Sequence, residues 1–212
     1  MNDSVGGERK ESGFAFLFRL TIKRLLSLIA VNLLFCVSIL PLVTLPNALA
    51  ALCRCVGLIL REEDFPLGKT YFTAFKSEFF KTMAVGWILL LLFFGAIAGA
   101  LFYWSVSAPL GLLLAIACTF MAVYFYLAAC NLFYMLSRVR LPFGALLKNA
   151  LILVFLQPIG GTAVCLLSFL ILVASAWWFP RTLPVIMLIS ESFAALLACY
   201  GVRDKIEKDI VS

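Results

Sequence analysis

Long runs of apolar residues, separated by short polar or basic stretches, organise the chain. One run extends from residue 25 to residue 60, and four more occupy 83–104, 109–136, 151–178 and 183–200. A run of about 20 apolar residues crosses a bilayer as an α-helix, because a helix satisfies its own backbone hydrogen bonds in lipid. The pattern therefore predicts an all-α protein, a polytopic bundle of transmembrane helices.

The first run is too long for one span, and the sequence ILPLVTLP interrupts it at residues 39–46. Proline lacks a backbone N–H, so Pro41 is expected to end one helix, while Pro46 suits the first turn of the next. Thr44 is expected to cap that second helix or to form a local hydrogen bond. We predict a helical hairpin with helices at 25–41 and 46–60. The second helix would rise about 22 Å against a hydrocarbon core of about 30 Å, so it either crosses a thinned bilayer or forms a re-entrant segment.

Basic residues gather at one end of each predicted span. They lie before residue 25, between 61 and 81, between 138 and 148, and after 202, whereas the linkers 105–108 and 179–182 carry few charges. Because Lys and Arg accumulate on the cytoplasmic side, we expect both termini in the cytoplasm. Six helices follow, at 25–41, 46–60, 83–104, 109–136, 151–178 and 183–200. They form one transmembrane domain at 14–202, between a flexible cytoplasmic N-terminus at 1–13 and a cytoplasmic tail at 203–212.

Two shorter patterns concern how the helices meet. The segment 71–81, YFTAFKSEFFK, places three phenylalanines on one helical face. It is either a separate helix lying in the cytoplasmic interface or an extension of the next span. The pair Gly95 and Gly99, at GxxxG spacing, permits close helix approach, which we expect within the bundle rather than between copies.

Glu191 lies near the middle of the last predicted span, between two serines. An ionised carboxylate in lipid costs several kcal/mol, so such a residue belongs either to a proton or ion pathway or to a contact that joins helices. The second role is favoured here. Arg54, in the second predicted helix, either pairs with Glu191 or extends its side chain to the cytoplasmic headgroups, and the latter is favoured.

Three amides, Asn32, Asn131 and Gln157, also fall within spans. Each is expected to join helices by hydrogen bonding rather than to bind a substrate. Gln157 begins the sequence QPIGG at residues 157–161, which would either break its helix, as in transporters, or only kink it. A kink is favoured.

Amino-acid composition argues against several classes of function, namely enzymes, metal or cofactor sites and nucleic-acid binding. Of 212 residues, 64% are hydrophobic and the mean hydropathy is +1.09, which fits lipid as the main solvent. Histidine is absent, and the seven cysteines lie in apolar surroundings as core residues. The sequence predicts no enzyme, no catalytic residue, no cofactor and no metal site. The basic residues, with a net charge of +6, indicate contact with anionic lipid and not with nucleic acid.

A family resemblance adds context. The residues Asn32-Leu33-Leu34-Phe35, the stretch 40–46 LPLVTLP, and the connector from Arg61 through Pro66 to Phe79 resemble the YesL-like family of bacterial membrane proteins. The activity of that family is not established, but its genes usually accompany carbohydrate uptake and polysaccharide utilisation. The resemblance implies an accessory protein of the bacterial plasma membrane, with the permease of an ABC transporter or another membrane protein as partner. A small solute or ion transporter or channel that uses the intramembrane polar residues is the alternative, and the sequence leaves a homo-oligomer open.

Overall fold

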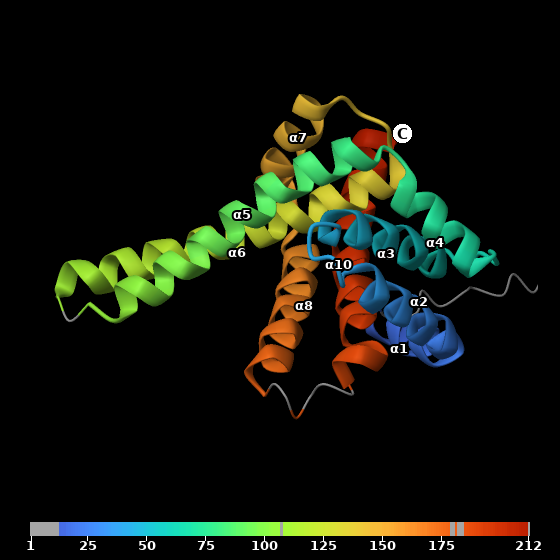
Figure 1. Cartoon of the computed structure of the whole chain (residues 1–212), viewed down its shortest axis with the longest axis horizontal. Helices are drawn as coiled ribbons and strands as arrows, with labels where there is room; N and C mark the ends of the chain where they lie inside the picture. The colour runs from blue at the N-terminus through green and yellow to red at the C-terminus, as the bar shows by residue number, and fades with distance from the viewer. Residues whose placement is uncertain (1–12, 107, 179–180, 182–184, 212) are drawn as a thin grey trace, which may run out of the picture.

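The computed structural model describes residues 13–106, 108–178, 181 and 185–211, and all regular elements among them are helical (Figure 1). The α-helices are α1 (Gly13–Lys23), α2 (Leu25–Ser38), α3 (Leu45–Leu60), α4 (Leu67–Lys76), α5 (Phe79–Trp104), α6 (Pro109–Arg138), α7 (Phe143–Leu156), α8 (Ile159–Trp177) and α10 (Glu191–Ile206). Two π-helical turns, η1 (Ile186–Ser190) and η2 (Glu207–Val211), flank α10. The predicted all-α fold is confirmed.

Several helices are suited to a membrane. By length and composition, α5, α6 and α8 can each cross one, and α1 with α2 forms a further candidate that is bent by 75°. Helices α3 and α7 are apolar but shorter. The predicted flexible segment 1–13 and the linker 179–182 lie almost wholly outside the described residues.

The N-terminal hairpin is present. Helix α2 ends at Ser38, three residues before the expected end at Pro41, and the chain reverses through a turn in which Leu42 has φ 49°. Thr44 precedes α3, but its hydroxyl donates to the Ser38 carbonyl (2.6 Å) instead of capping that helix. Pro46 lies in the first turn of α3, where its missing N–H needs no partner.

Ion pairs hold the two ends of this hairpin together. Lys23 and Arg19 contact Glu62 at 2.7 and 3.2 Å, and Arg24 contacts Asp64 at 2.8 Å. The residues just before α2 therefore lie beside those just after α3. A segment that crossed a bilayer once would hold these two groups a full membrane thickness apart, so the chain doubles back as expected.

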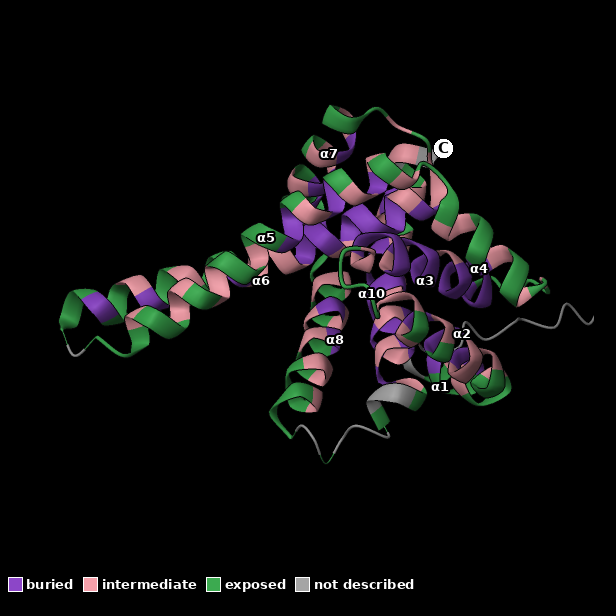
Figure 2. Ribbon diagram, viewed as in Figure 1, coloured by how far each residue is buried: buried purple, intermediate pink, exposed green. Residues whose placement is uncertain are grey.

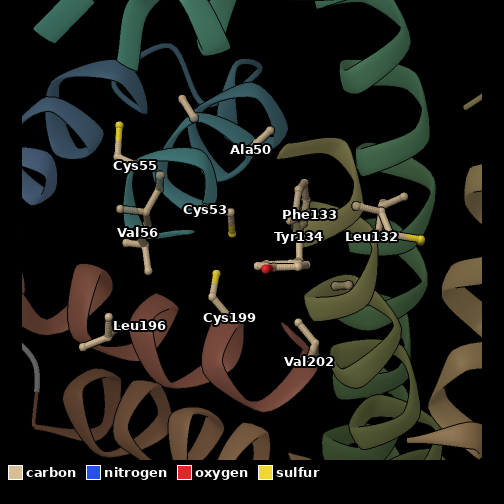
Figure 3. Close-up of a cluster of buried hydrophobic side chains, with 14 of the residues drawn as sticks. Ala50, Cys53, Cys55, Val56, Leu132, Phe133, Tyr134, Leu196, Cys199 and Val202 are labelled. Carbon is tan, nitrogen blue, oxygen red and sulfur yellow. The ribbon is translucent and has the colours of Figure 1, made fainter. Parts of the chain in front are cut away.

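The core of the protein is α3, which contacts α2, α4, α5, α6 and α10. Nearly every one of its residues is buried (Figure 2). Small side chains, among them Ala48, Ala51 and Gly57, let so many neighbours approach. Figure 3 shows Cys53 of α3 and Cys199 of α10 pointing toward each other between α3, α6 and α10. All seven cysteines are free, so here they serve as small apolar packing residues.

Helices α5 and α6 form a long hairpin that extends away from the other helices (Figure 1). Its inner half is buried against the bundle and its outer half is largely exposed (Figure 2). Gly99 packs on Cys118 of α6 within this hairpin, whereas a methyl group on Gly95 would have no neighbour within 4 Å. Helix α4 is separate from α5, because Glu78 between them has φ 47°. The segment 71–81 is therefore divided: residues 71–76 belong to the separate helix α4, and residues 79–81 form the first turn of α5.

Two expected spans differ in the structure. The span predicted at 151–178 is two helices, α7 and α8, because Gln157 and Pro158 are both extended, with ψ 135° and 146°. Proline disfavours the helical conformation at the preceding residue by steric clash, and the favoured kink is corrected to a break. The span predicted at 183–200 continues to Ile206, and its described part begins at the helical Val185, directly before the π-helical turn η1.

Candidate functional site

The polar residues inside the bundle are the candidates for function, and Glu191 is the most costly of them. It begins α10 directly after the π-helical turn and is half-buried. Among the described residues, none lies within hydrogen-bonding or ion-pair distance of its carboxylate. The Cys36 thiol of α2 is near enough to interact with it electrostatically. Arg54 bonds to the Ser137 carbonyl instead, and the hypothetical ion pair between Arg54 and Glu191 is not formed.

Asn32 fixes the same junction from α2. It is fully buried, and its Oδ1 accepts a hydrogen bond from the backbone N–H of Ser192 (2.8 Å). The regular backbone hydrogen-bonding pattern is interrupted next to Glu191, where the chain changes from a π-helix to an α-helix. A buried N–H group at this point needs an acceptor, and the Asn32 side chain of α2 provides it. Ser190, also at this junction, shares a hydrogen bond with Ser175 of α8 (2.8 Å).

Arg54 joins α3 to α6. Its Nη1 donates to the Ser137 carbonyl at 2.6 Å, which is one of the last carbonyls of α6 and has no partner within that helix. This end of α6 is the one expected to face the cytoplasm. Arg54 therefore stabilises this helix end, and its favoured extension to the cytoplasmic headgroups stays a prediction.

Gln157 occupies the break between α7 and α8. Its Nε2 donates to the Gly201 carbonyl of α10 (3.3 Å) and lies 3.5 Å from the Cys165 sulfur. Its Oε1 is buried without a hydrogen-bond partner in the described part of the chain. Asn131 of α6 is buried too, and its Nδ2 has no partner among the described residues. The two amides lie at different helix contacts and do not meet Glu191.

A glycine contact brings α8 against α10 next to this break. A Cβ on Gly201 would lie 2.6 Å from the Gly161 carbonyl oxygen, and a Cβ on Gly161 would meet the Gly201 carbonyl oxygen even more closely. Only glycine at both positions permits this approach. A cavity of about 720 Å³ opens beside the contact, lined by α1, α8 and α10.

Asn47 was not among the predicted site residues, yet its Nδ2 bonds to two backbone carbonyls, while its Oδ1 is buried with no hydrogen-bond partner among the described residues. It is buried in the first turn of α3, and its Nδ2 lies 3.2 Å from both the Phe75 and the Phe79 carbonyl oxygens. It thereby holds the α4–α5 connection. The available signal was an amide directly after Pro46 in an otherwise apolar helix, which points to a need for a polar partner in lipid.

Side chains outside the spans connect the expected cytoplasmic ends of the helices. Glu207 of η2 forms an ion pair with Arg61 and accepts a hydrogen bond from the Tyr134 hydroxyl (2.9 Å). Partial burial favours a higher pKa for Glu207, but these two partners outweigh it and the pKa is lowered. The Lys23 ammonium, hydrogen-bonded to Glu62, likewise lowers the pKa of that carboxyl.

One family model matches part of the chain. The model of a family described as "Protein of unknown function, DUF624" matches residues 28–100. These residues comprise most of α2, then α3 and α4, and most of α5. No curated protein and no solved structure matches the chain significantly. The matched part thus contains the hairpin, Asn32, Asn47 and Arg54, but neither Gln157 nor Glu191. Within the described residues, no group of three or more His, Cys, Asp or Glu side chains is placed to hold a metal ion.

Proposed function

We propose that the protein is a non-enzymatic accessory of carbohydrate uptake in the bacterial plasma membrane. In this proposal it acts by binding a membrane transporter, such as an ABC-transporter permease, or its regulator at the cytoplasmic face. The matched family supplies no activity, and the carbohydrate context rests on the resemblance of residues 30–85 to YesL-like proteins.

The observation that carries the proposal is the dispersal of the intramembrane polar residues. Asn32, Gln157 and Arg54 each bond to the backbone of another helix, at three separate contacts. Transport would require polar groups that converge along one path. Polar residues used as separate braces are instead suited to a protein whose function is to hold its shape and present a surface.

The surface that best fits such a partner is α4. It carries the exposed Phe72 between the exposed lysines Lys69 and Lys76, while Tyr71 on its other side is fully buried. An exposed aromatic side chain among basic ones, at the expected edge of the membrane, provides both apolar contact and charge steering toward a partner.

A photo-crosslinking experiment in the native membrane tests the proposal. A photoreactive phenylalanine analogue at Phe72 should capture a carbohydrate-transporter subunit, and deleting the gene should reduce uptake of the corresponding sugar. The matched control is the same analogue at Phe120, which is 72% exposed on the outer part of α6 and should capture no such subunit. Equal labelling at both positions together with unchanged uptake in the deletion strain would contradict the proposal.

A second candidate, a small solute or ion transporter, is favoured by one observation: the cavity of about 720 Å³ lies beside the broken α7–α8 connection. In proteoliposomes, this candidate requires a solute or proton flux that falls in Glu191→Gln but not in Glu78→Gln. Glu78 makes a charge-matched control because it lies between α4 and α5, outside the spans. Equal flux in protein-free vesicles and in proteoliposomes would remove this candidate.

A further inference from the structure

A second cavity, of about 440 Å³, lies between α3, α4 and the segment that follows α6. Four cationic side chains line it: Arg54 from α3, Lys69 from α4, and Arg138 and Arg140 from the end of α6 and the linker beyond. No acidic residue belongs to its described lining. Four like charges around one cavity repel each other unless an anion shares them.

The nearby acidic residues form ion pairs with other cations, although Glu207 is close enough to Arg138 to interact with it electrostatically. Glu62 pairs with Lys23 of α1, Asp64 pairs with Arg24 just after α1, and Glu207 pairs with Arg61. By contrast, Lys69, Arg138 and Arg140 form no ion pair or hydrogen bond with any described residue. The Arg138 Nε is buried without a hydrogen-bond partner in the same part of the chain, although a buried donor normally has one.

Further donors face the same cavity. The first turn of α4 lines it through Pro66, Lys69 and Thr70, and this turn contains no acidic residue. Of these three, only Lys69 can offer a backbone N–H, because Pro66 has none and the Thr70 N–H donates to the Pro66 carbonyl (2.9 Å). An N–H in the first turn has no partner within the helix and carries partial positive charge, which favours phosphate. The hydroxyl groups of Thr73 and Ser77 complete the polar wall.

We propose that this cavity binds a phosphate group, with Lys69, Arg138 and Arg140 as its charged ligands. The Nη1 of Arg54 donates to the Ser137 carbonyl. The positive charge of its guanidinium still adds to the positive potential in the cavity. A cavity of this volume lies within the range of small-ligand sites, about 300–1,000 Å³, and accommodates a phospholipid headgroup or a small phosphate ester. Because the cavity opens at the expected cytoplasmic edge of the membrane, the headgroup of an anionic lipid and a soluble phosphate are the two sources of this chemistry.

The test compares the full-length protein with two double variants of equal charge. Lys69→Gln with Arg140→Gln removes two cavity cations, and Lys148→Gln with Arg181→Gln removes two exposed cations that do not line the cavity. Binding is measured in one arm by native mass spectrometry and thermal shift with phosphatidylglycerol against phosphatidylcholine. The second arm uses inorganic phosphate against chloride at equal ionic strength. Arg140→Gln alone replaces the double variant if that variant does not purify as a monodisperse protein.

A lipid headgroup site predicts saturable retention of phosphatidylglycerol by the wild type and the control, weakened at least about tenfold in the cavity variant. A soluble-phosphate site predicts that inorganic phosphate raises the melting temperature of the wild type and the control but not of the cavity variant. Either result supports the proposal and identifies the source. Equal behaviour of the cavity variant and the control in both arms would overturn it.

Discussion

Adding a single methyl group at Gly161 should separate the α8–α10 contact from general effects on helix stability. The new Cβ would meet the Gly201 carbonyl oxygen at much less than van der Waals distance, and the atom is backbone, so α8 or α10 must shift. At the adjacent Gly160, a Cβ would meet nothing within 4 Å. Both glycines lie in the first turn of α8, so Gly160→Ala is a matched control.

The magnitude follows from two opposing effects. Alanine is favoured over glycine in a helix by about 1 kcal/mol, and this gain applies to both variants. Overpacking a close contact costs about 1–3 kcal/mol, and this cost applies to Gly161→Ala alone. Because the helix-propensity effect cancels, the difference between the two variants measures the contact itself, about 1–3 kcal/mol.

Thermal unfolding in a mild detergent, followed by circular dichroism, is the assay. For a chain of this size, the difference corresponds to a melting temperature of Gly161→Ala lower than that of Gly160→Ala by about 2–12 °C. Gly201→Ala should behave like Gly161→Ala, since its Cβ would meet the Gly161 carbonyl oxygen at 2.6 Å. If Gly161→Ala melts at or above Gly160→Ala, the helices do not meet at these glycines and the reasoning is refuted.

Three further predictions concern single side chains. Asn32→Leu should lower the free energy of unfolding by about 1–2 kcal/mol, because the Ser192 N–H loses its acceptor; equal stability to the wild type in detergent melting would contradict this. Asn131→Leu, in the same assay, should leave stability unchanged or raise it, because the buried Nδ2 that it removes has no described partner. The carboxyl of Glu62 has a lowered pKa, so its contribution is present above its unfolded pKa of about 4.3 and is lost as pH falls through the folded pKa. Glu62→Gln should therefore melt below the wild type at pH 7, and the gap should shrink as pH falls below about 4.3 and close once pH is below the lowered folded pKa. A gap that stays constant into acid would exclude this cause.

The N-terminal hairpin could be predicted because two local signals agreed. Pro41 and Pro46 mark a turn by backbone chemistry, and the basic residues on both sides of the run require an even number of passes. The detail of the turn could not be predicted. Thr44 bonds backward to Ser38 and not forward into α3, and Trp87 of α5 donates to the Val43 carbonyl (2.9 Å). These contacts depend on how distant helices are placed.

The break after α7 shows where local signals are insufficient. Pro158 makes both a kink and a break possible, and what stabilises the break lies on α10. The Gly201 carbonyl accepts from Gln157, and Gly201 itself allows α8 to approach. No periodicity in residues 151–178 encodes that partner, so the choice between the two was a tertiary effect.

The sequence identified the polar residues of the candidate site but not their hydrogen-bond partners. The polar residues in apolar runs were found because lipid makes them costly, and Asn32, Gln157 and Arg54 each bond to the backbone of another helix. Their partners are backbone groups, which sequence cannot distinguish, so a pairing of Arg54 with Glu191 was a natural hypothesis from charge alone. The phosphate cavity was missed for the same reason, since α3, α4 and the end of α6 meet only in the folded chain.

The most direct test of the central claim, that residues 25–60 double back, is zero-length carbodiimide crosslinking in native membranes. The reagent joins an ammonium and a carboxylate in contact, and Lys23 and Glu62 lie 2.7 Å apart across the ends of the hairpin. The local pair Lys81 and Glu78, also at 2.7 Å, reports whether the reaction works. Mass spectrometry should detect an amide between Lys23 and Glu62 that disappears in Lys23→Arg. Detection of the Lys81–Glu78 amide without the Lys23–Glu62 amide would contradict the account.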